Sequence, residues 1–428
     1  MKPSASQQAA FLLINWVHCR MVLLYRLSLW IYGLIIRTLA GSVQKARDFV
    51  NGRKGIFEQV AVQLEGSEKD IVWVHAASVG EYEQGKPIIE ALKRELPHLS
   101  ILLTFFSPSG YNSYKQSAHV DYVFYLPMDS PSNAKRFLEL VNPKIALFIK
   151  YEFWYFYMLE LARRDIPLLL VSSVFRPNQM FFQRFGTFYL RALQSTSHFL
   201  VQDDDSKTLL QSYGIAQVTV SGDTRIDQML QVREEAWPSE VLASFTKDHL
   251  VIVCGSLWPS DWDLIREVIS KMPEVRIIIA PHEISEDELQ SYEAAGAQRI
   301  TKFQENDSYQ ILLVDYIGDL KRMYRYGHFA YVGGAFRGAV HNVIEPAVYG
   351  LPIVIGEHAN NDKFVEVREL KYLGGIKEAA DSQQLFSIFE SLVYDQELRK
   401  SMSEVCQEYV QQHAGATDKV MKKIKELL

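Results

Sequence analysis

From residue 70 onward, short apolar runs alternate with longer amphipathic segments, and this alternation leaves the chain few possible folds. The runs are rich in Val, Ile, Leu and Phe, as is typical of strands buried on both faces of a sheet. The intervening segments carry apolar residues at helical spacing. Strands that alternate with helices predict a parallel, doubly wound α/β sheet. The first set of runs is "DIVWVHA", "SILLTFF", "YVFYLP", "KIALFIK", "PLLLVSS", "HFLVQ" and "QVTVSG".

The pattern is interrupted once and then starts again. Residues 227–249 are polar and contain a proline, and they are followed by "LVIVCGS", "VRIIIAP", "YQILLVD", "HFAYVGG" and "PIVIG". We therefore expect two Rossmann-like domains, at 49–228 and 229–428. In such sheets ligands bind outside the carboxyl ends of the strands, so two of them are expected to face a shared cleft.

The composition agrees with two globular domains and excludes some functions. The 428 residues are 48% hydrophobic and 22% charged, which is enough to form two ordinary cores. A net charge of -6 supplies no basic field for a nucleic-acid backbone, so nucleic acid is not an expected partner. Cys19, Cys254 and Cys406 are far apart and lack CxxC spacing, so neither a disulfide framework nor a zinc site is indicated.

Residues 1–48 differ from the rest and predict a membrane anchor. From Met21 to Ala40 apolar residues occur nearly all round a helix, but Arg26 and Arg37 interrupt them. A helix that spans the bilayer and one that lies in its interface both fit this pattern. A helix buried in a soluble core is the alternative, although arginines beside Trp and Tyr suit an interface better. Basic residues follow at 45–54, and the positive-inside rule places the later domains in the cytoplasm.

The stretch "HAASVGEYEQGKP" places Glu81 at the turn between a strand and a helix. Ser78 and Glu81 have the S-x-x-E spacing of a capping box, so Glu81 has a structural interpretation. Gly80 is a poor helix former in a first turn, and the small residues before it leave room for another molecule. Glu81 can therefore also be a catalytic base, and the spacing leaves both interpretations open.

The stretch "YVGGAFRGAVHNVIEPAVYG" is the corresponding turn of the second domain. Its glycines Gly333, Gly334 and Gly338 precede a short helix opened by Asn342, and backbone amides in such a loop can bind phosphate. Glu345 could accept hydrogen bonds from ribose hydroxyls, or it could be a cap partner of Asn342. The pattern is not GxGxxG, so it supports nucleotide binding only weakly.

Candidate residues follow four other strands. Pro281 and His282 follow one strand of the second domain, and residues 317–319 follow another, so both lie at the same sheet edge as the glycine loop. Residues 203–205 are a run of three aspartates, for which helix capping is favoured over metal binding. Glu152 lies in the aromatic stretch "KYEFWYFY", where an unpartnered carboxylate would be costly, so a buried hydrogen bond or a catalytic role is expected.

These motifs, taken in order, resemble those of the 3-deoxy-D-manno-octulosonic acid (Kdo) transferases of lipopolysaccharide assembly. They are "HAASVGE", "YLPMD", "KYEFW", "SSVFRPNQ", "VSGDTRID", "CGSLWPSD", "APHE", "IGDL" and "GAVHNVIEPAVYG". The resemblance implies the GT-B fold and the inverting transfer of Kdo from CMP-Kdo to a lipid A precursor, lipid IVA. It also implies membrane lipids as partners, the inner (cytoplasmic) membrane as location, and catalytic domains on its cytoplasmic side.

The resemblance assigns roles to matching positions. Glu81 corresponds to the catalytic base, and Glu152 and Arg225 to residues that stabilise the transition state. Arg225 stands where many members have Lys, which changes the donor geometry. The CMP site would be formed by Pro281, His282, Ile317, Gly318, Asp319, Asn342, Val343, Ile344 and Glu345.

No metal or other cofactor is expected, because GT-B sites typically stabilise the leaving phosphate with a helix N-terminus and basic side chains. Two alternatives remain from the sequence. One is another membrane-associated GT-B transferase that uses a nucleotide sugar or a CDP-linked polyol. The other is a membrane-tethered binder of nucleotide or sugar that has lost catalysis.

Overall fold

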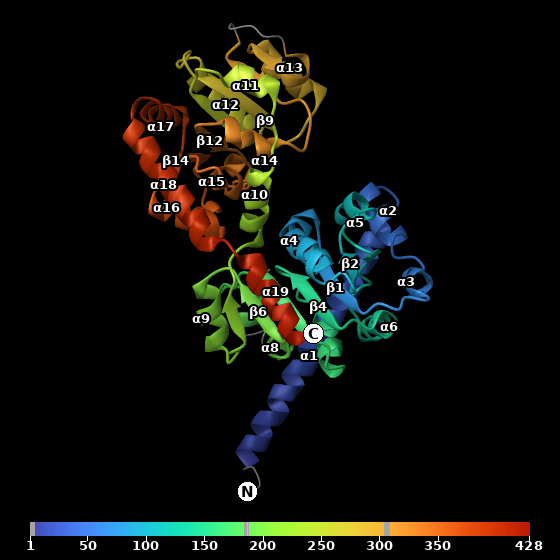
Figure 1. The fold of residues 1–428 in the computed structure, drawn as a ribbon. Helices are drawn as coiled ribbons and strands as arrows, with labels where there is room; N and C mark the ends of the chain where they lie inside the picture. Colours follow the sequence, from blue (N-terminus) through green and yellow to red (C-terminus); the bar gives the residue numbers. More distant parts are fainter. Residues whose placement is uncertain (1–4, 184–185, 187, 304–308) are drawn as a thin grey trace. The chain divides into compact units, whose positions relative to one another are not determined.

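The computed structural model describes residues 5–183, 186, 188–303 and 309–428. It divides into two compact units (Figure 1). The first comprises Met1–Thr224 and Gly415–Leu428, and the second comprises Arg225–Ala414.

The first unit contains a parallel sheet of seven strands in the order β3-β2-β1-β4-β5-β6-β7. Each of the seven predicted runs is one of these strands. The strands are β1 (Ile71–Ala76), β2 (Ser100–Phe105), β3 (Tyr122–Tyr125), β4 (Ile145–Ile149), β5 (Leu168–Ser173), β6 (His198–Val201) and β7 (Val218–Val220). The helices are α2 (Gln44–Asn51), α3 (Ile56–Leu64), α4 (Val79–Glu95), α5 (Pro108–Tyr114), α6 (Pro131–Val141), α7 (Tyr155–Arg163), α8 (Phe188–Gln194) and α9 (Asp204–Ser212).

The continuous apolar strands are explained by a hydrophobic core on each face of this sheet. Successive side chains of a strand point to opposite faces. In β1, Trp73 packs in the core that contains Phe137 and Phe148, whereas Val72 and Val74 pack in the core on the other face. Both kinds of position must therefore be apolar, which is why the runs do not alternate with polar residues.

The second unit also has a parallel seven-stranded sheet, in the order β10-β11-β9-β8-β12-β13-β14. The strands are β8 (Val251–Leu257), β9 (Arg276–Pro281), β10 (Ala297–Arg299), β11 (Ile311–Leu313), β12 (Phe329–Val332), β13 (Ile353–Gly356) and β14 (Ile376–Ala379). The helices are α10 (Thr224–Glu234), α11 (Glu240–Thr246), α12 (Pro259–Ile269), α13 (Glu286–Ala294), α14 (Leu320–Met323), α15 (Ile344–Val348), α16 (Val365–Leu373), α17 (Ser382–Tyr394) and α18 (Gln396–His413).

The two units confirm the doubly wound fold class, but two strands of the second sheet were not predicted. These are the edge strands β10 and β14, which are short and carry polar residues such as Gln298 and Lys377. An edge strand has a neighbour on one side only and need not be apolar throughout, so its sequence signal is weak.

The last helix, α19 (Ala416–Leu427), packs with the first unit, although the expected division placed residues 229–428 together. Val420, Met421 and Ile424 lie in the core of the first unit with β1 and α4. Lys425 Nζ also pairs with Glu95 Oε2 at 2.8 Å. Figure 1 shows this red helix beside the strands of the first unit. The apolar stripe of α19 packs on residues that are distant in sequence. Local sequence patterns do not reveal such a contact.

The N-terminal helix α1 (Ala5–Leu39) has one apolar face exposed and another packed on the first unit. Its stretch His18–Leu39 is long and apolar enough to cross a membrane. On the packed side, the Tyr25 hydroxyl donates to Asp129 Oδ2 at 2.7 Å, and Met21 and Val22 contact the core. On the other side, apolar residues are exposed: Leu23, Leu24, Leu27, Trp30, Ile31, Leu34 and Ile35. The alternative of a helix buried in a soluble core is therefore wrong.

Candidate functional site

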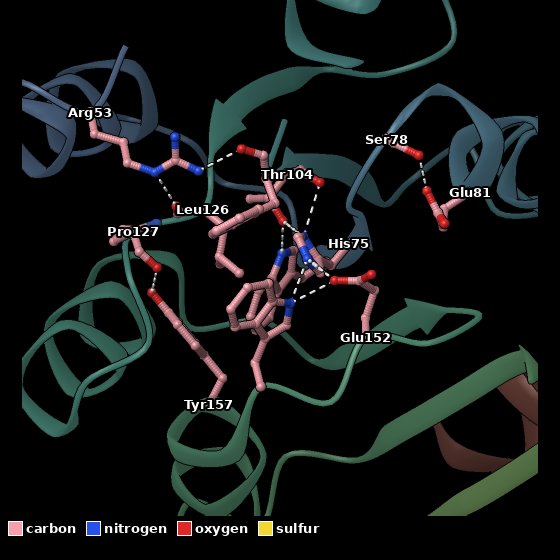
Figure 2. A network of polar contacts seen from close by, with 12 residues as sticks. Arg53, His75, Ser78, Glu81, Thr104, Leu126, Pro127, Glu152 and Tyr157 are labelled. Carbon is pink, nitrogen blue, oxygen red and sulfur yellow. Dashed lines mark hydrogen bonds and ion pairs between the residues drawn. The ribbon is translucent and has the colours of Figure 1, made fainter. Parts of the chain in front are cut away.

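The topology of the first sheet brings Glu81 and Glu152 to the same edge. Strand β1 pairs with β2 on one side and with β4 on the other, so the strand order reverses direction between β1 and β4. Ligands of doubly wound sheets bind in the crevice at such a reversal, outside the carboxyl ends of the strands. Glu81 follows β1 and Glu152 follows β4 (Figure 2).

Glu81 lies half-buried in the first turn of α4, and its carboxylate has a specific partner. The Ser78 hydroxyl donates a hydrogen bond to Glu81 Oε2. Ser78 is the N-cap residue, but its side chain accepts no backbone N–H group of the helix. The capping-box interpretation is therefore wrong, because the serine is oriented toward the carboxylate and not toward the helix amides. This arrangement holds the Glu81 carboxylate in place at the sheet edge.

Gly80 is exposed beside this carboxylate. A Cβ atom added there would meet only Ser78 Oγ, at 3.9 Å, which is an ordinary van der Waals distance. The packing of the first unit therefore does not require glycine at this position. Space left for an approaching molecule remains the better explanation of the small residue.

Glu152 is buried and forms part of a hydrogen-bonded network. His75 Nε2 lies 3.0 Å from Glu152 Oε2, and Trp154 Nε1 donates to the same oxygen at 2.7 Å. Only 7% of the Glu152 surface is exposed, and His75 is fully buried. The expectation of a buried hydrogen bond is confirmed, because these donors offset the cost of removing a carboxylate from water.

The network continues through His75 to the neighbouring strand β2. His75 Nδ1 lies 3.0 Å from the Thr104 carbonyl oxygen and 2.8 Å from Thr104 Oγ1, which also accepts from Trp73 Nε1 at 2.8 Å. His75 Nε2 lies within hydrogen-bond distance of both Glu152 Oε2 and Trp154 Nε1. Figure 2 shows His75 between Thr104 and Glu152. The sequence thus fixes the orientation of Glu152 with residues on three different strand ends.

Arg225 lies at the start of α10 and belongs to the second unit. Its Nη2 donates to Glu366 Oε1 at 2.8 Å, and the side chain of Glu366 is almost fully buried. This ion pair fixes the direction of the guanidinium. Arg225 is thus held by its own unit, whereas Glu81 and Glu152 belong to the first unit.

The second sheet has its reversal between β8 and β12, and a stack of rings lies at that edge. Trp258 follows β8, His282 follows β9 and His341 lies in the loop after β12. The ring centroids of Trp258 and His282 are 4.3 Å apart, and so are those of His282 and His341. Trp258 Nε1 donates to His341 Nε2 at 2.8 Å, and the Arg337 guanidinium lies 4.6 Å from the Trp258 ring centroid. The carboxyl edge of this sheet thus carries a ring stack, formed by Trp258, His282 and His341, with a cation beside it.

The loop after β12 is tightly packed against the ring stack. A Cβ atom on Gly334, where φ is 102°, would lie 2.5 Å from His341 Cδ2, so only glycine fits. The amides of Gly334, Val340 and His341 already donate to Asp261, to Asn361 and to the Gly333 carbonyl. The expected phosphate cradle of free amides is thus largely occupied by internal bonds. Arg337, which is exposed, is better placed to meet an anion.

Asn342 and Glu345 are joined at the start of α15. Asn342 Oδ1 accepts from the Ile344 amide at 3.2 Å, and Asn342 Nδ2 donates to Glu345 Oε1 at 3.2 Å. This pair therefore supports the first turn of α15, although the N-cap residue is Val343, which makes no side-chain cap bond. The side chains of Val343 and Ile344 are buried, so only their backbone atoms could contact a ligand.

The turn after β11 lies further along the sheet, because β9 separates β11 from β8. Ile317 is 82% exposed, and Asp319 Oδ1 accepts from Arg322 Nη1 at 3.1 Å. Gly318 has a φ of 125°, a conformation that favours glycine. No described contact joins residues 317–319 to the ring stack, whereas Pro281 leads directly into it.

Asp203 is a helix cap. Its Oδ1 accepts from the Ser206 amide at 2.8 Å at the start of α9. This confirms the interpretation of the aspartate run that the sequence favoured.

The ring stack gives a pH dependence of stability. Burial and the neighbouring His282 lower the pKa of His341 to about 4. The unfolded chain, with a histidine pKa near 6.5, then binds the proton more readily between these values, so the free energy of unfolding falls as the pH is lowered from 7 toward 4. After allowance for partial exposure we expect a loss on the order of 1 kcal/mol at pH 5. Urea unfolding at pH 7 and pH 5 should show a smaller loss for His341→Gln. An equal loss in both proteins would contradict this origin.

The sequence did not single out His75, Trp154, Trp258 and His341. Each lies inside a motif that was noted for a neighbouring residue, at the end of a predicted strand. Their position at strand ends was therefore a signal of a functional role. Their contacts could not be predicted, because they join residues far apart in sequence.

The family model and the three curated relatives below carry the same enzyme name. A family model described as 3-deoxy-D-manno-octulosonic-acid transferase (kdotransferase) matches residues 51–228. A 3-deoxy-D-manno-octulosonic acid transferase from Haemophilus influenzae is 25% identical over 83% of this chain and 87% of its own. The enzymes of the same name from Bordetella pertussis and Aquifex aeolicus are 27% and 28% identical, over 83% and 68% of this chain and 87% and 77% of their own.

Solved structures with the same architecture are more distant in sequence. The UDP-GlcNAc 2-epimerase of Neisseria meningitidis, bound to UDP-GlcNAc, aligns with a TM-score of 0.61 and 15% identity over 83% of this chain and all of its own. The MurG structure from Acinetobacter baumannii aligns with a TM-score of 0.55 and 12% identity, over 84% of this chain and 99% of its own. These likenesses support the GT-B fold. The match of the first unit to the family model, and relatives that align along most of the chain, show that this chain is similar to 3-deoxy-D-manno-octulosonic acid transferases.

Proposed function

We propose that this glycosyltransferase transfers Kdo from CMP-Kdo to a lipid A precursor, lipid IVA, with inversion at the anomeric carbon. The observation that carries the proposal is the placement of Glu81 and Glu152 at the β1/β4 edge in a chain that is similar to Kdo transferases. Glu81 is held by a hydroxyl group and Glu152 by a histidine and a tryptophan. A positioned carboxylate is what the activation of an alcohol requires.

The reaction is a single displacement. The Glu81 carboxylate accepts the proton of the primary hydroxyl on the distal glucosamine, and that oxygen forms a bond to the anomeric carbon of Kdo. The bond from this carbon to the phosphate oxygen of CMP breaks at the same time, and CMP leaves with the electron pair. Glu81 then releases its proton to water. Glu81 acts from the face opposite the leaving group, which inverts the anomeric centre.

Two charged side chains would stabilise the transition state. Positive charge develops on the Kdo ring as the bond to CMP breaks, and the Glu152 carboxylate can offset it in its buried setting. Negative charge develops on the leaving phosphate, and Arg225 can offset that charge. We expect these groups to serve without a metal ion, so an excess of chelator should leave the rate unchanged.

CMP-Kdo would bind at the β8/β12 edge of the second unit. The ring stack of Trp258, His282 and His341 offers a flat apolar surface, and Arg337 offers a cation. Glu345 can accept hydrogen bonds from ribose hydroxyls, because Asn342 holds its carboxylate at the start of α15. The turn at 317–319 is expected to complete the CMP site.

Glu345→Ala should weaken CMP binding by about 1 to 3 kcal/mol, the worth of hydrogen bonds to a charged group. Calorimetry with CMP measures this, beside a thermal unfolding curve. Glu357→Ala is a matched control, because Glu357 is an exposed carboxylate after the next strand, β13. A lower melting temperature with unchanged CMP affinity would show that Glu345 only caps the helix, a role worth about 1 kcal/mol.

The docking of α1 supports an anchor that lies in the membrane interface. Tyr25 bonds to Asp129, and Tyr32 lies 6.0 Å from Phe49 between ring centroids, so contacts with the first unit extend along the apolar stretch. A segment packed on a water-soluble domain over this length cannot also be surrounded by lipid on all sides. The exposed face of α1 would instead insert into the cytoplasmic leaflet of the inner membrane.

Replacing Leu24, Leu27 and Leu34 by glutamate should release the protein from membranes, since these residues lie on the exposed apolar face. Flotation with vesicles that contain anionic lipid measures this. Three glutamates at the exposed positions Gln59, Gln63 and Gln211 add a similar charge away from that face and should leave flotation intact. Flotation of the α1 variant at the parent level would refute the assignment.

The proposed reaction is tested directly with purified protein. Incubation with CMP-Kdo and a tetraacylated lipid A precursor should release CMP and add the mass of Kdo to the lipid, as read by mass spectrometry. Nucleoside diphosphate sugars in the same assay should not be consumed. Binding of CMP-Kdo without CMP release would instead favour a binder without catalysis.

A further inference from the structure

The first unit contains a cavity of about 320 Å³ beside the C-terminal end of α1. Apolar side chains such as Ile36 and Phe49 form part of its wall. The start of α6 closes another side with Asn133. The cavity therefore lies beside the last turns of α1, where Leu34 and Ile35 are exposed.

Three cations line this cavity, and none of its lining residues is a carboxylate. They are Arg37, Arg53 and Lys54. Among the residues that the structure describes, no Asp or Glu forms an ion pair with any of these three. Three like charges around one cavity repel one another unless an anion lies between them.

Arg53 is the most constrained of the three. Its guanidinium donates to the carbonyl oxygens of Leu126, Phe49 and Phe106, and it lies 3.7 Å from the Phe49 ring centroid. Carbonyl groups orient the cation without neutralising it. Burial lowers the pKa of Arg53 to about 10, so it remains protonated at neutral pH while its charge is only partly compensated. An anion in the cavity would offset this cost.

A series of residue contacts links the cavity lining to the candidate catalytic carboxylate. Arg53 Nη2 donates to the Phe106 carbonyl at 2.7 Å, and the Phe106 ring lies 4.7 Å from that of Trp154. Trp154 in turn donates to Glu152. Figure 2 shows Arg53 and Glu152 on opposite sides of Thr104 and His75. These contacts place Arg53 of the cavity lining two residues, Phe106 and Trp154, away from Glu152 at the β1/β4 edge.

We propose that this cavity binds a phosphate group carried by a lipid. The three cations can pair with the oxygens of a phosphate monoester, and the apolar part of the wall, next in sequence to the exposed Leu34 and Ile35 of α1, suits the lipid part. The source of the phosphate rests on the proposed function: the phosphorylated glucosamine of the acceptor would occupy the cavity and direct its hydroxyl group toward Glu81.

Binding to the full chain in nonionic detergent tests this without any transfer reaction. The probes are a bisphosphorylated tetraacyl glucosamine disaccharide, the same lipid with its phosphates removed, and inorganic phosphate. Thermophoresis should show at least tenfold tighter binding of the phosphorylated lipid. Inorganic phosphate should bind far more weakly than that lipid. Because CMP-Kdo is absent, a failure of the catalytic proposal would not affect the result.

Variants separate the cavity from general surface charge. Arg37→Gln with Lys54→Gln should reduce the preference for the phosphorylated lipid to threefold or less, whereas Lys45→Gln with Lys115→Gln, an equal change at exposed sites outside the cavity, should preserve it. Arg53 is left intact, because its bonds to three carbonyls support the fold. Gly33→Leu adds bulk at the cavity wall, where an added Cβ meets nothing within 4 Å, and should weaken binding of the same lipid.

Three results would overturn the proposal. The first is equal binding of the phosphorylated and dephosphorylated lipids. The second is an equal loss in the control variant, which would show attraction to the surface in general. The third is binding of inorganic phosphate as tight as that of the lipid, which would assign the cavity to a free anion.

Discussion

Glu81→Gln is expected to lower the rate of Kdo transfer by about two to four orders of magnitude, the usual contribution of a positioned base. Glutamine keeps the size of the side chain, and its carbonyl oxygen can still accept the Ser78 hydroxyl hydrogen. It cannot accept the proton of the acceptor hydroxyl. The melting temperature and the affinity for CMP should therefore stay close to those of the parent. Single-turnover transfer with saturating CMP-Kdo measures the effect.

Two further variants sharpen this test. Glu81→Asp should lose nearly as much activity, because it withdraws the carboxylate by one methylene group from both Ser78 and the acceptor. Ser78→Ala should cost much less, since it removes only the hydroxyl that orients the base. Transfer by Glu81→Gln at more than about a tenth of the parent rate is well above what the loss of a base allows, and would show that Glu81 is not the base.

Glu152→Gln is expected to lower the transfer rate by about two to three orders of magnitude, as when one preorganised electrostatic group is removed. The charge that would offset the developing positive charge on the Kdo ring is lost. Trp154 keeps an oxygen to which it can donate, but the new amide group adds donors in a buried site. A decrease in the free energy of unfolding of about 1 to 3 kcal/mol should accompany the loss of activity.

The role of Glu152 in catalysis can be separated from its role in packing. Trp154→Phe removes one donor to Glu152 and leaves its negative charge, so it should lower stability with a smaller effect on the rate. Urea unfolding and single-turnover transfer on the same preparations give the two quantities. If Glu152→Gln is destabilised yet transfers at the parent rate, the network of His75, Trp154 and Glu152 serves the fold alone.

The sequence predicted the two doubly wound sheets because their strands are local and continuous in apolar residues. The period of two in β1 places Trp73 and Val74 in different cores, so both positions must be apolar and the run is easy to recognise. Edge strands such as β14 lack this constraint and were missed. The partner of α19 was missed as well, because the match of an apolar stripe to a distant surface leaves no local mark.

Sequence order alone determined that Glu81, Glu152 and the glycine loop after β12 lie at strand ends, since a parallel sheet gathers the carboxyl ends of its strands at one edge. Only the tertiary structure decided what each group contacts. Ser78 could have capped α4 or held Glu81, and one side-chain rotation separates the two. The His75–Glu152 contact and the ring stack of His282 and His341 join residues from different strands, so their hydrogen bonds and distances depend on how the sheets are packed.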